Sequence, residues 1–75
     1  MNLPAIPSPD DWNKMSVQSK AAHLAAVTHV RGIKLSWAEE RLIAAHAFGE
    51  QRPADIFHQT TLDGIRQAHY HQLYL

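Results

Sequence analysis

Residues 16–32 read SVQSKAAHLAAVTHVRG and carry the strongest helix signal in the chain. Ser16 is a suitable N-cap, because its hydroxyl can accept a hydrogen bond from a free amide of the first helical turn. From Val17 to Arg31 every residue is a good or acceptable helix former, with no proline or glycine. Gly32 follows, and glycine readily takes the left-handed conformation that ends many helices. The stretch therefore predicts a helix from Val17 to Arg31.

This predicted helix is apolar on more than one side. A spacing of about 100° per residue places five residues on one stripe: Val17, Ala21, Leu24, Ala25 and Thr28. Further apolar residues lie outside that stripe: Ala22, Ala26, Val27 and Val30. Helices that are apolar on most sides are buried centrally or packed against a partner chain. We expect either the central helix of a small bundle or a homodimer interface.

A capping box marks a second helix. Ser36 and Glu39 are three residues apart, so each side chain can accept a hydrogen bond from the backbone amide of the other. The helix is expected to run from Trp37 to Phe48 and to stop at Gly49. We expect Trp37 and Phe48 to be core anchors at its two ends. The residues expected to face inward between them are Ala38, Leu42 and Ala45.

The N-terminal segment is interpreted as an arm. Residues 1–11 contain three prolines, and each proline favours an extended conformation in the residue before it. Residues 12–75 are expected to form a single helical domain. Where the two meet, Ser8 and Pro9, followed by two aspartates, predict the start of a short helical turn through Trp12.

The C-terminal third predicts two more helical segments. A proline at its start can open a short helix over 53–58. Thr60 or Thr61 then serves as the N-cap of a last helix over 62–75. Alternating β-branched runs, the signal for strands, are absent. The fold class is therefore predicted to be all-α, a single small domain of three to four short helices.

Two faces of the last helix differ in chemistry. One face is apolar apart from a histidine: Leu62, Ile65, His69 and Leu73. We therefore expect His69 to lie in the core or at its edge. Another face gathers tyrosines and hydrogen-bonding side chains, which are typical of binding surfaces. The predicted partner-binding residues on it are Gln67, Tyr70, His71 and Tyr74. The alternative is that both tyrosines only pack against the rest of the fold.

Binding to duplex DNA is the alternative function. The seven basic residues are balanced by seven acidic ones, which argues against a strongly basic DNA-binding protein. Residues 53–74 nevertheless have the outline of a degenerate helix-turn-helix, although Phe57 occupies a position that is normally small and Thr60 replaces the usual turn glycine. The residues expected at the bases are Arg66, Gln67, Tyr70 and His71. The residues expected at the phosphates are Lys20, Arg31 and Lys34.

No pattern in the sequence marks an active site or a bound cofactor. There is no glycine-rich phosphate loop and no recognisable nucleophile with its base. None of the six histidines has a partner three or four residues away, the spacing that puts two metal ligands on one helical face. A metal site assembled between helices, such as His23 with His46 or His69, is the remaining alternative. We expect no metal, no cofactor and no catalytic activity.

The composition also bears on compartment and partner. Cysteine is absent, which excludes disulfides and thiolate metal sites, and no apolar run reaches the 18 residues of a membrane span. We expect a cytoplasmic protein without a membrane partner. The sequence thus predicts a small non-enzymatic helical protein that binds another protein as an inhibitor, adaptor or regulatory subunit, with a homodimer left open. A DNA-binding transcriptional regulator is the alternative.

Overall fold

The computed structural model describes residues 6–48 and 55–75, and the side chains at 6–48 and 61–75. These residues form five helices and no strand, which confirms the predicted all-α fold. The helices are α1 (Pro9–Lys14), α2 (Val17–Arg31), α3 (Trp37–Ala47), α4 (Asp55–Ala68) and α5 (Tyr70–Tyr74).

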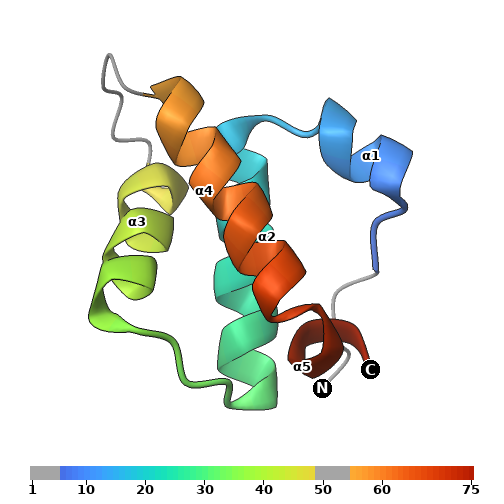
Figure 1. Cartoon of the computed structure of the whole chain (residues 1–75), viewed down its shortest axis with the longest axis vertical. Helices are drawn as coiled ribbons and strands as arrows, with labels where there is room; N and C mark the ends of the chain where they lie inside the picture. Colours follow the sequence, from blue (N-terminus) through green and yellow to red (C-terminus); the bar gives the residue numbers. More distant parts are fainter. Residues whose placement is uncertain (1–5, 49–54) are drawn as a thin grey trace.

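The central element is α2, as the sequence predicted. It contacts α3, α4 and α5, and α4 crosses it while α1 and α3 lie on opposite sides (Figure 1). The Ser16 hydroxyl accepts a hydrogen bond from the amide of Ser19, and Gly32 ends the helix with a left-handed φ of 64°. Both predicted ends are confirmed. The buried residues are Lys20, Ala21, Leu24, Val27 and Thr28.

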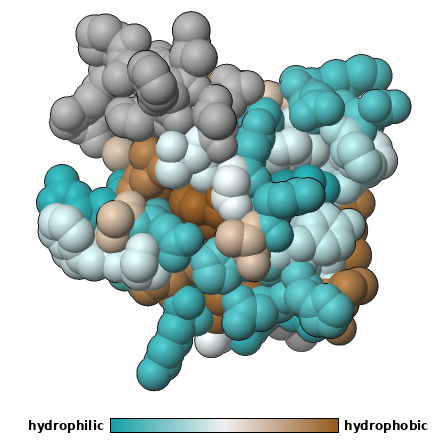
Figure 2. Space-filling model, viewed as in Figure 1, coloured by the Kyte–Doolittle hydropathy of each residue, from teal (hydrophilic) through white to brown (hydrophobic). Residues whose placement is uncertain are grey.

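The core collects side chains from all five helices. Polar groups cover most of the face in Figure 2, and hydrophobic side chains are visible in its middle and along one edge. The short helix α1 contributes only Trp12 and is capped by the Ser8 side chain, as predicted. Residues 1–5 of the predicted arm lie outside the described residues. The buried hydrophobic residues are Trp12, Ala21, Leu24, Val27, Ile43, Leu62, Ile65, Leu73 and Tyr74.

The face that α3 turns to the core is rotated from the predicted one, although the predicted Leu42 is partly buried against the core. Its capping box between Ser36 and Glu39 is present. However, the buried residues are Ile43 and His46, whereas Ala38 is exposed. The inward face was predicted from apolar residues alone, so His46 was not considered for it. Because consecutive residues of a helix are about 100° apart, the predicted face differs from the observed one by about that angle.

The aromatic residues at the two ends of α3 are consequently at the surface. Trp37 is 72% exposed and Phe48 is 87% exposed. The prediction that they anchor the core was wrong, because the inward face of the helix lies about 100° or more from Trp37. Gly49, the predicted stop, lies outside the described residues.

The helix α4 is continuous where a turn was expected. It runs from Asp55 to Ala68, so Thr60 and Thr61 lie inside it and neither caps a new helix. The predicted turn of a helix-turn-helix is therefore wrong. A local hydroxyl cap competes with helix continuation, and continuation wins here because it brings the next apolar residues of α4 into the core.

The break in the C-terminal helix comes later than predicted. His69 has φ −107° and ψ 14°, and α5 begins at the next residue. His69 itself is partly buried, which confirms its predicted position at the edge of the core. Pro53, the predicted start of the preceding short helix, lies outside the described residues.

Candidate functional site

A buried arginine lies at the centre of an aromatic cluster. Only 7% of Arg66 is exposed, and its Cζ lies 4.8 Å from the ring centroid of Trp12, 5.3 Å from that of Tyr70 and 5.6 Å from that of Tyr74. These contacts bring α1, α4 and α5 together around one positive charge. The rings attract the cation through their negative faces.

The hydrogen bonding of the buried Arg66 guanidinium is incomplete within the described residues. Neither Nε nor Nη2 has a hydrogen-bond partner within the described part of the chain. Burying such donors is unfavourable, and an apolar side chain of similar volume often stabilises a core equally well or better. A locally unfavourable residue of this kind is typical of functional sites.

A second buried cation lies beside the same tryptophan. Lys20 is 1% exposed, its Nζ lies 3.4 Å from Oδ1 of Asp63, and it also lies 5.2 Å from the ring centroid of Trp12. Trp12 Nε1 donates a hydrogen bond to the same Oδ1 at 2.7 Å. One carboxylate therefore serves both groups and joins α1, α2 and α4.

His23 and Tyr74 complete the cluster on the side of α2. Nε2 of His23 lies 2.7 Å from the hydroxyl of Tyr74, and the two rings stack at 5.8 Å. Burial, together with the nearby Arg66 charge, lowers the pKa of His23, so the imidazole favours its neutral form. Burial raises the pKa of Tyr74. We call the whole set the Arg66 cluster: Trp12, Lys20, His23, Asp63, Arg66, Tyr70 and Tyr74.

The predicted partner-binding residues divide between the surface and this cluster. Gln67 and His71 are exposed, and Tyr70 is 38% exposed. Tyr74 is only 8% exposed, so it supports the surface from beneath. We call Gln67, Tyr70 and His71 the C-terminal surface. A depression of about 430 Å³ adjoins it, lined by Trp12, Asn13, Asp63, Gly64, Arg66 and Gln67.

The residues expected at DNA are also divided. Lys20 and Arg66 are buried, so neither cation is available at the surface. Arg31 is exposed, but its Nη1 donates a hydrogen bond to the carbonyl of Leu73 at 2.9 Å. Lys34 is exposed. Two positive charges that the DNA prediction assigned to bases and phosphates are therefore engaged within the fold.

A histidine at the break between α4 and α5 joins these helices to α3. Nδ1 of His69 lies 2.8 Å from Oε1 of Gln72, and Nε2 lies 3.1 Å from Oε2 of Glu39. The hydrogen bond to Gln72 and the pairing with Glu39 raise the pKa of His69. The bond from the Ser36 amide is the main cause that lowers the pKa of Glu39, and His69 adds to it.

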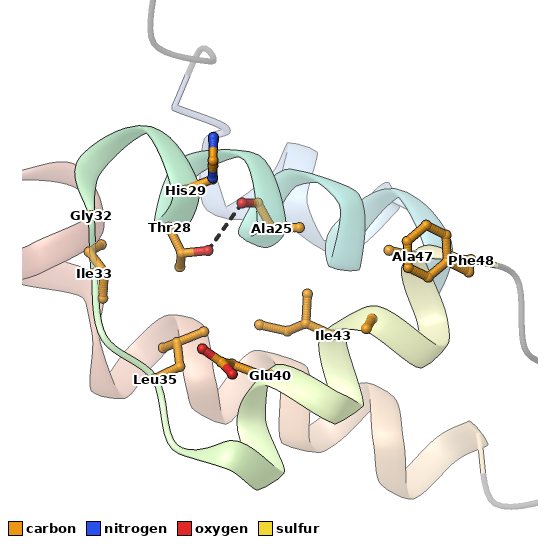
Figure 3. A pocket seen from close by; sticks show the side chains of 11 residues that line it. Ala25, Thr28, His29, Gly32, Ile33, Leu35, Glu40, Ile43, Ala47 and Phe48 are labelled. Carbon is orange, nitrogen blue, oxygen red and sulfur yellow. Dashed lines mark hydrogen bonds between the residues drawn. The ribbon is translucent and has the colours of Figure 1, made fainter.

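An open apolar groove lies on the other side of α2. It has a volume of about 560 Å³ between α2 and α3, with Ile33 and Leu35 at one end and Phe48 at the other (Figure 3). The hydroxyl of Thr28 lies in the groove wall and donates to the carbonyl oxygens of Leu24 and Ala25 within α2. Glu40 and His29 lie at the groove and supply its polar groups.

Two parts of these sites differ from what the sequence predicts. Lys20 and Arg66 were assigned to the surface, because no local pattern reveals that Asp63 and Trp12 lie beside Lys20 or that three aromatic rings surround Arg66. Trp37 and Phe48 were also placed in the core. The one available signal was their separation of eleven residues, which is close to three helical turns and puts both on one face with Arg41 near the same side.

Neither a metal-binding cluster nor a membrane-spanning helix is present among the described residues. Among residues 6–48 and 61–75, no three histidine or acidic side chains gather in a way that could hold a metal ion. No helix in the described ranges is both long and apolar enough to cross a membrane. Comparison with known proteins gave no matching family model, no similar curated protein and no matching solved structure.

Proposed function

We propose that this chain is a non-enzymatic helical protein that binds another protein through the C-terminal surface. The observation that carries the proposal is that the ring of Tyr70 is both held by its neighbours and exposed to solvent. Its ring lies 5.3 Å from the Arg66 guanidinium and 4.9 Å from the ring of Tyr74 at an interplanar angle of 71°, while 38% of the residue is exposed.

A tyrosine held in this way is suited to recognition. Ordering a side chain on binding reduces affinity, and a ring that is already fixed by its neighbours loses little freedom. Tyrosine and arginine are also enriched among the residues that dominate binding energy. The exposed Gln67 and His71 on either side of Tyr70 add hydrogen-bonding groups. An inhibitor, an adaptor or a regulatory subunit would use such a surface.

The Arg66 cluster gives this surface its rigidity. Arg66 supports Tyr70 and Tyr74 at once, although two of its nitrogens lack hydrogen-bond partners in the described residues. Arg66 is an unfavourable cation beneath the exposed Tyr70. Its presence there supports selection for the shape of the C-terminal surface rather than for stability. Duplex DNA is the less favoured partner, because Lys20 and Arg66 lie in the interior.

Site-specific photo-crosslinking tests the proposal. A photoreactive phenylalanine analogue at Gln67, introduced in the cells that make the protein, is expected to give a discrete adduct with another protein. The same analogue at Lys34, exposed in the loop between α2 and α3, is the matched control. Tyr70→Ala in the chain that carries the analogue at Gln67 should abolish the adduct.

Folding must be separated from binding in this experiment. His71→Ala changes an exposed side chain and should weaken the adduct without altering the circular dichroism spectrum. The proposal fails if the Gln67 position gives no protein adduct, or if Gln67 and Lys34 give the same adducts.

A further inference from the structure

The exposed edge of α3 carries an apolar stripe. Trp37, Ala44 and Phe48 are seven and four residues apart, and these spacings place them within about 40° of one another around the helix. All three are exposed, with Trp37 at 72% and Phe48 at 87%. We call these three residues the α3 stripe. Large exposed aromatic side chains grouped on one face are typical of protein interfaces.

Two opposite charges flank the α3 stripe. Glu40 and Arg41 are consecutive, so they project about 100° apart and differ by only about 1.5 Å along the helix axis. Glu40 lies on the side of the α2–α3 groove, and Arg41 lies on the other side of the stripe with its Cζ 5.0 Å from the Trp37 centroid. Both side chains are exposed.

We propose that the α3 stripe binds a second copy of this chain, with the two α3 helices parallel about a two-fold axis. In this arrangement Trp37 packs on Trp37 and Phe48 on Phe48, as required of an isologous interface. Rotation about a two-fold axis parallel to the helices places the Glu40 side of one stripe opposite the Arg41 side of the other. Glu40 of each copy therefore faces Arg41 of the other, and two ion pairs form across the interface.

Charge selects the parallel arrangement over the antiparallel one. In the antiparallel pair the two-fold axis is perpendicular to the helices, and equivalent sides of the two stripes meet. Glu40 would therefore face Glu40, and Arg41 would face Arg41. Like charges in contact are unfavourable and exclude the wrong pairing. The parallel pair has the additional advantage that Ala44 meets Ala44 between the two aromatic contacts, where a small side chain lets the two helices approach.

A second copy also fits the size and charge of the chain. The formal net charge is zero, so two copies do not repel one another at long range. Aromatic side chains bury about 150–250 Å² each, so the exposed parts of two tryptophans and two phenylalanines supply about 500–800 Å². Together with the flanking residues, this approaches the roughly 1,000 Å² that a specific interface requires, and a weak dimer is expected.

Sedimentation velocity of the full chain with charge-exchanged variants tests this pairing. Glu40→Arg and Arg41→Glu should each weaken dimerisation about tenfold or more, because both ion pairs become like-charge contacts. The double variant Glu40→Arg/Arg41→Glu should restore the dimer. An equimolar mixture of the two single variants should also dimerise, because each then faces the opposite charge.

Two further variants separate this inference from the proposed function. Trp37→Ala should weaken the dimer at least about tenfold. Gln67→Glu, which changes the C-terminal surface, should leave dimerisation unchanged. The inference is overturned if the unaltered chain is monomeric at all concentrations, if Trp37→Ala has no effect, or if neither the double variant nor the mixture recovers the dimer. None of these results affects the prediction of a protein adduct at Gln67, so the two proposals can fail independently.

Discussion

The carboxylate of Asp63 accepts a 2.7 Å hydrogen bond from the indole nitrogen of Trp12 and lies 3.4 Å from the ammonium of Lys20 through the same oxygen. Asp63 is itself 46% exposed at the side chain, whereas Lys20 is 1% exposed. The buried Lys20 ammonium is therefore stabilised by the carboxylate of Asp63, which is about half exposed to solvent.

Asp63→Ala is expected to destabilise the protein by about 3 kcal/mol, because it leaves both Lys20 and the Trp12 indole without this partner. Urea denaturation at neutral pH measures the loss. Asp10→Asn, at an exposed position in the first turn of α1, is the control and should change stability by less than about 1 kcal/mol. A small effect of Asp63→Ala would mean that water replaces the carboxylate.

Arg66→Met tests whether the buried guanidinium serves stability. Methionine fills similar space and removes the two nitrogens that lack hydrogen-bond partners in the described residues. The free energy of unfolding should rise or stay within about 1 kcal/mol of its original value. Crosslinking from Gln67 should decrease in the same variant, because Tyr70 loses its support. A loss of several kcal/mol would instead assign Arg66 a purely structural role.

The pH dependence of stability should show a maximum near pH 6.5, set by two histidines with opposite pKa shifts. The folded pKa of His69 is raised, so its stabilisation is complete below the ordinary value of 6.5 and is lost as pH rises through the folded pKa. The folded pKa of His23 is lowered, so its contribution is present above 6.5 and is lost as pH falls through the folded pKa.

Urea midpoints between pH 5 and pH 8.5 measure this dependence. His69→Gln should flatten the alkaline side of the maximum, and His23→Gln should flatten the acid side. His29→Gln, at an exposed position of α2, is the matched control for the substitution itself. A stability curve without a maximum in this range would contradict the prediction.

The two described glycines should respond to alanine in opposite directions. Gly32 has a φ of +64°, so alanine there is strained by about 1 kcal/mol, although a methyl group at this position would have no neighbour within 4 Å. Gly64 lies inside α4, where a methyl group would also have no neighbour within 4 Å, so alanine should stabilise by roughly 0.5–1 kcal/mol. Thermal unfolding of both variants provides the comparison, and a shift of the same sign would contradict it.

Local signals were sufficient for much of the fold. Ser16 and Gly32 bound α2, and the capping box at Ser36 begins α3, because caps depend on groups within one helical turn. The continuity of α4 through Thr60 and Thr61 could not be predicted from such local signals. At Thr61 a local capping tendency competes with packing of distant residues, and only the tertiary structure decides between them.

The candidate sites were less predictable for the same reason. Gln67 and Tyr70 were grouped from their spacing of three residues, which is a local property, although the break at His69 places them in α4 and α5. The burial of Arg66 and Lys20 depends on Trp12, which is more than fifty residues away from Arg66 in the sequence. Trp37 was misplaced because an aromatic residue at a helix end suits a core or an interface equally well, and sequence alone does not distinguish them.

The two tryptophans of this chain report on different regions through their fluorescence. Trp12 is 3% exposed and Trp37 is 72% exposed. Iodide in solution should quench the emission of Trp37 selectively, and the remaining emission should follow the interior around Arg66. One unlabelled sample can thus distinguish events at the edge of α3 from events beneath Tyr70.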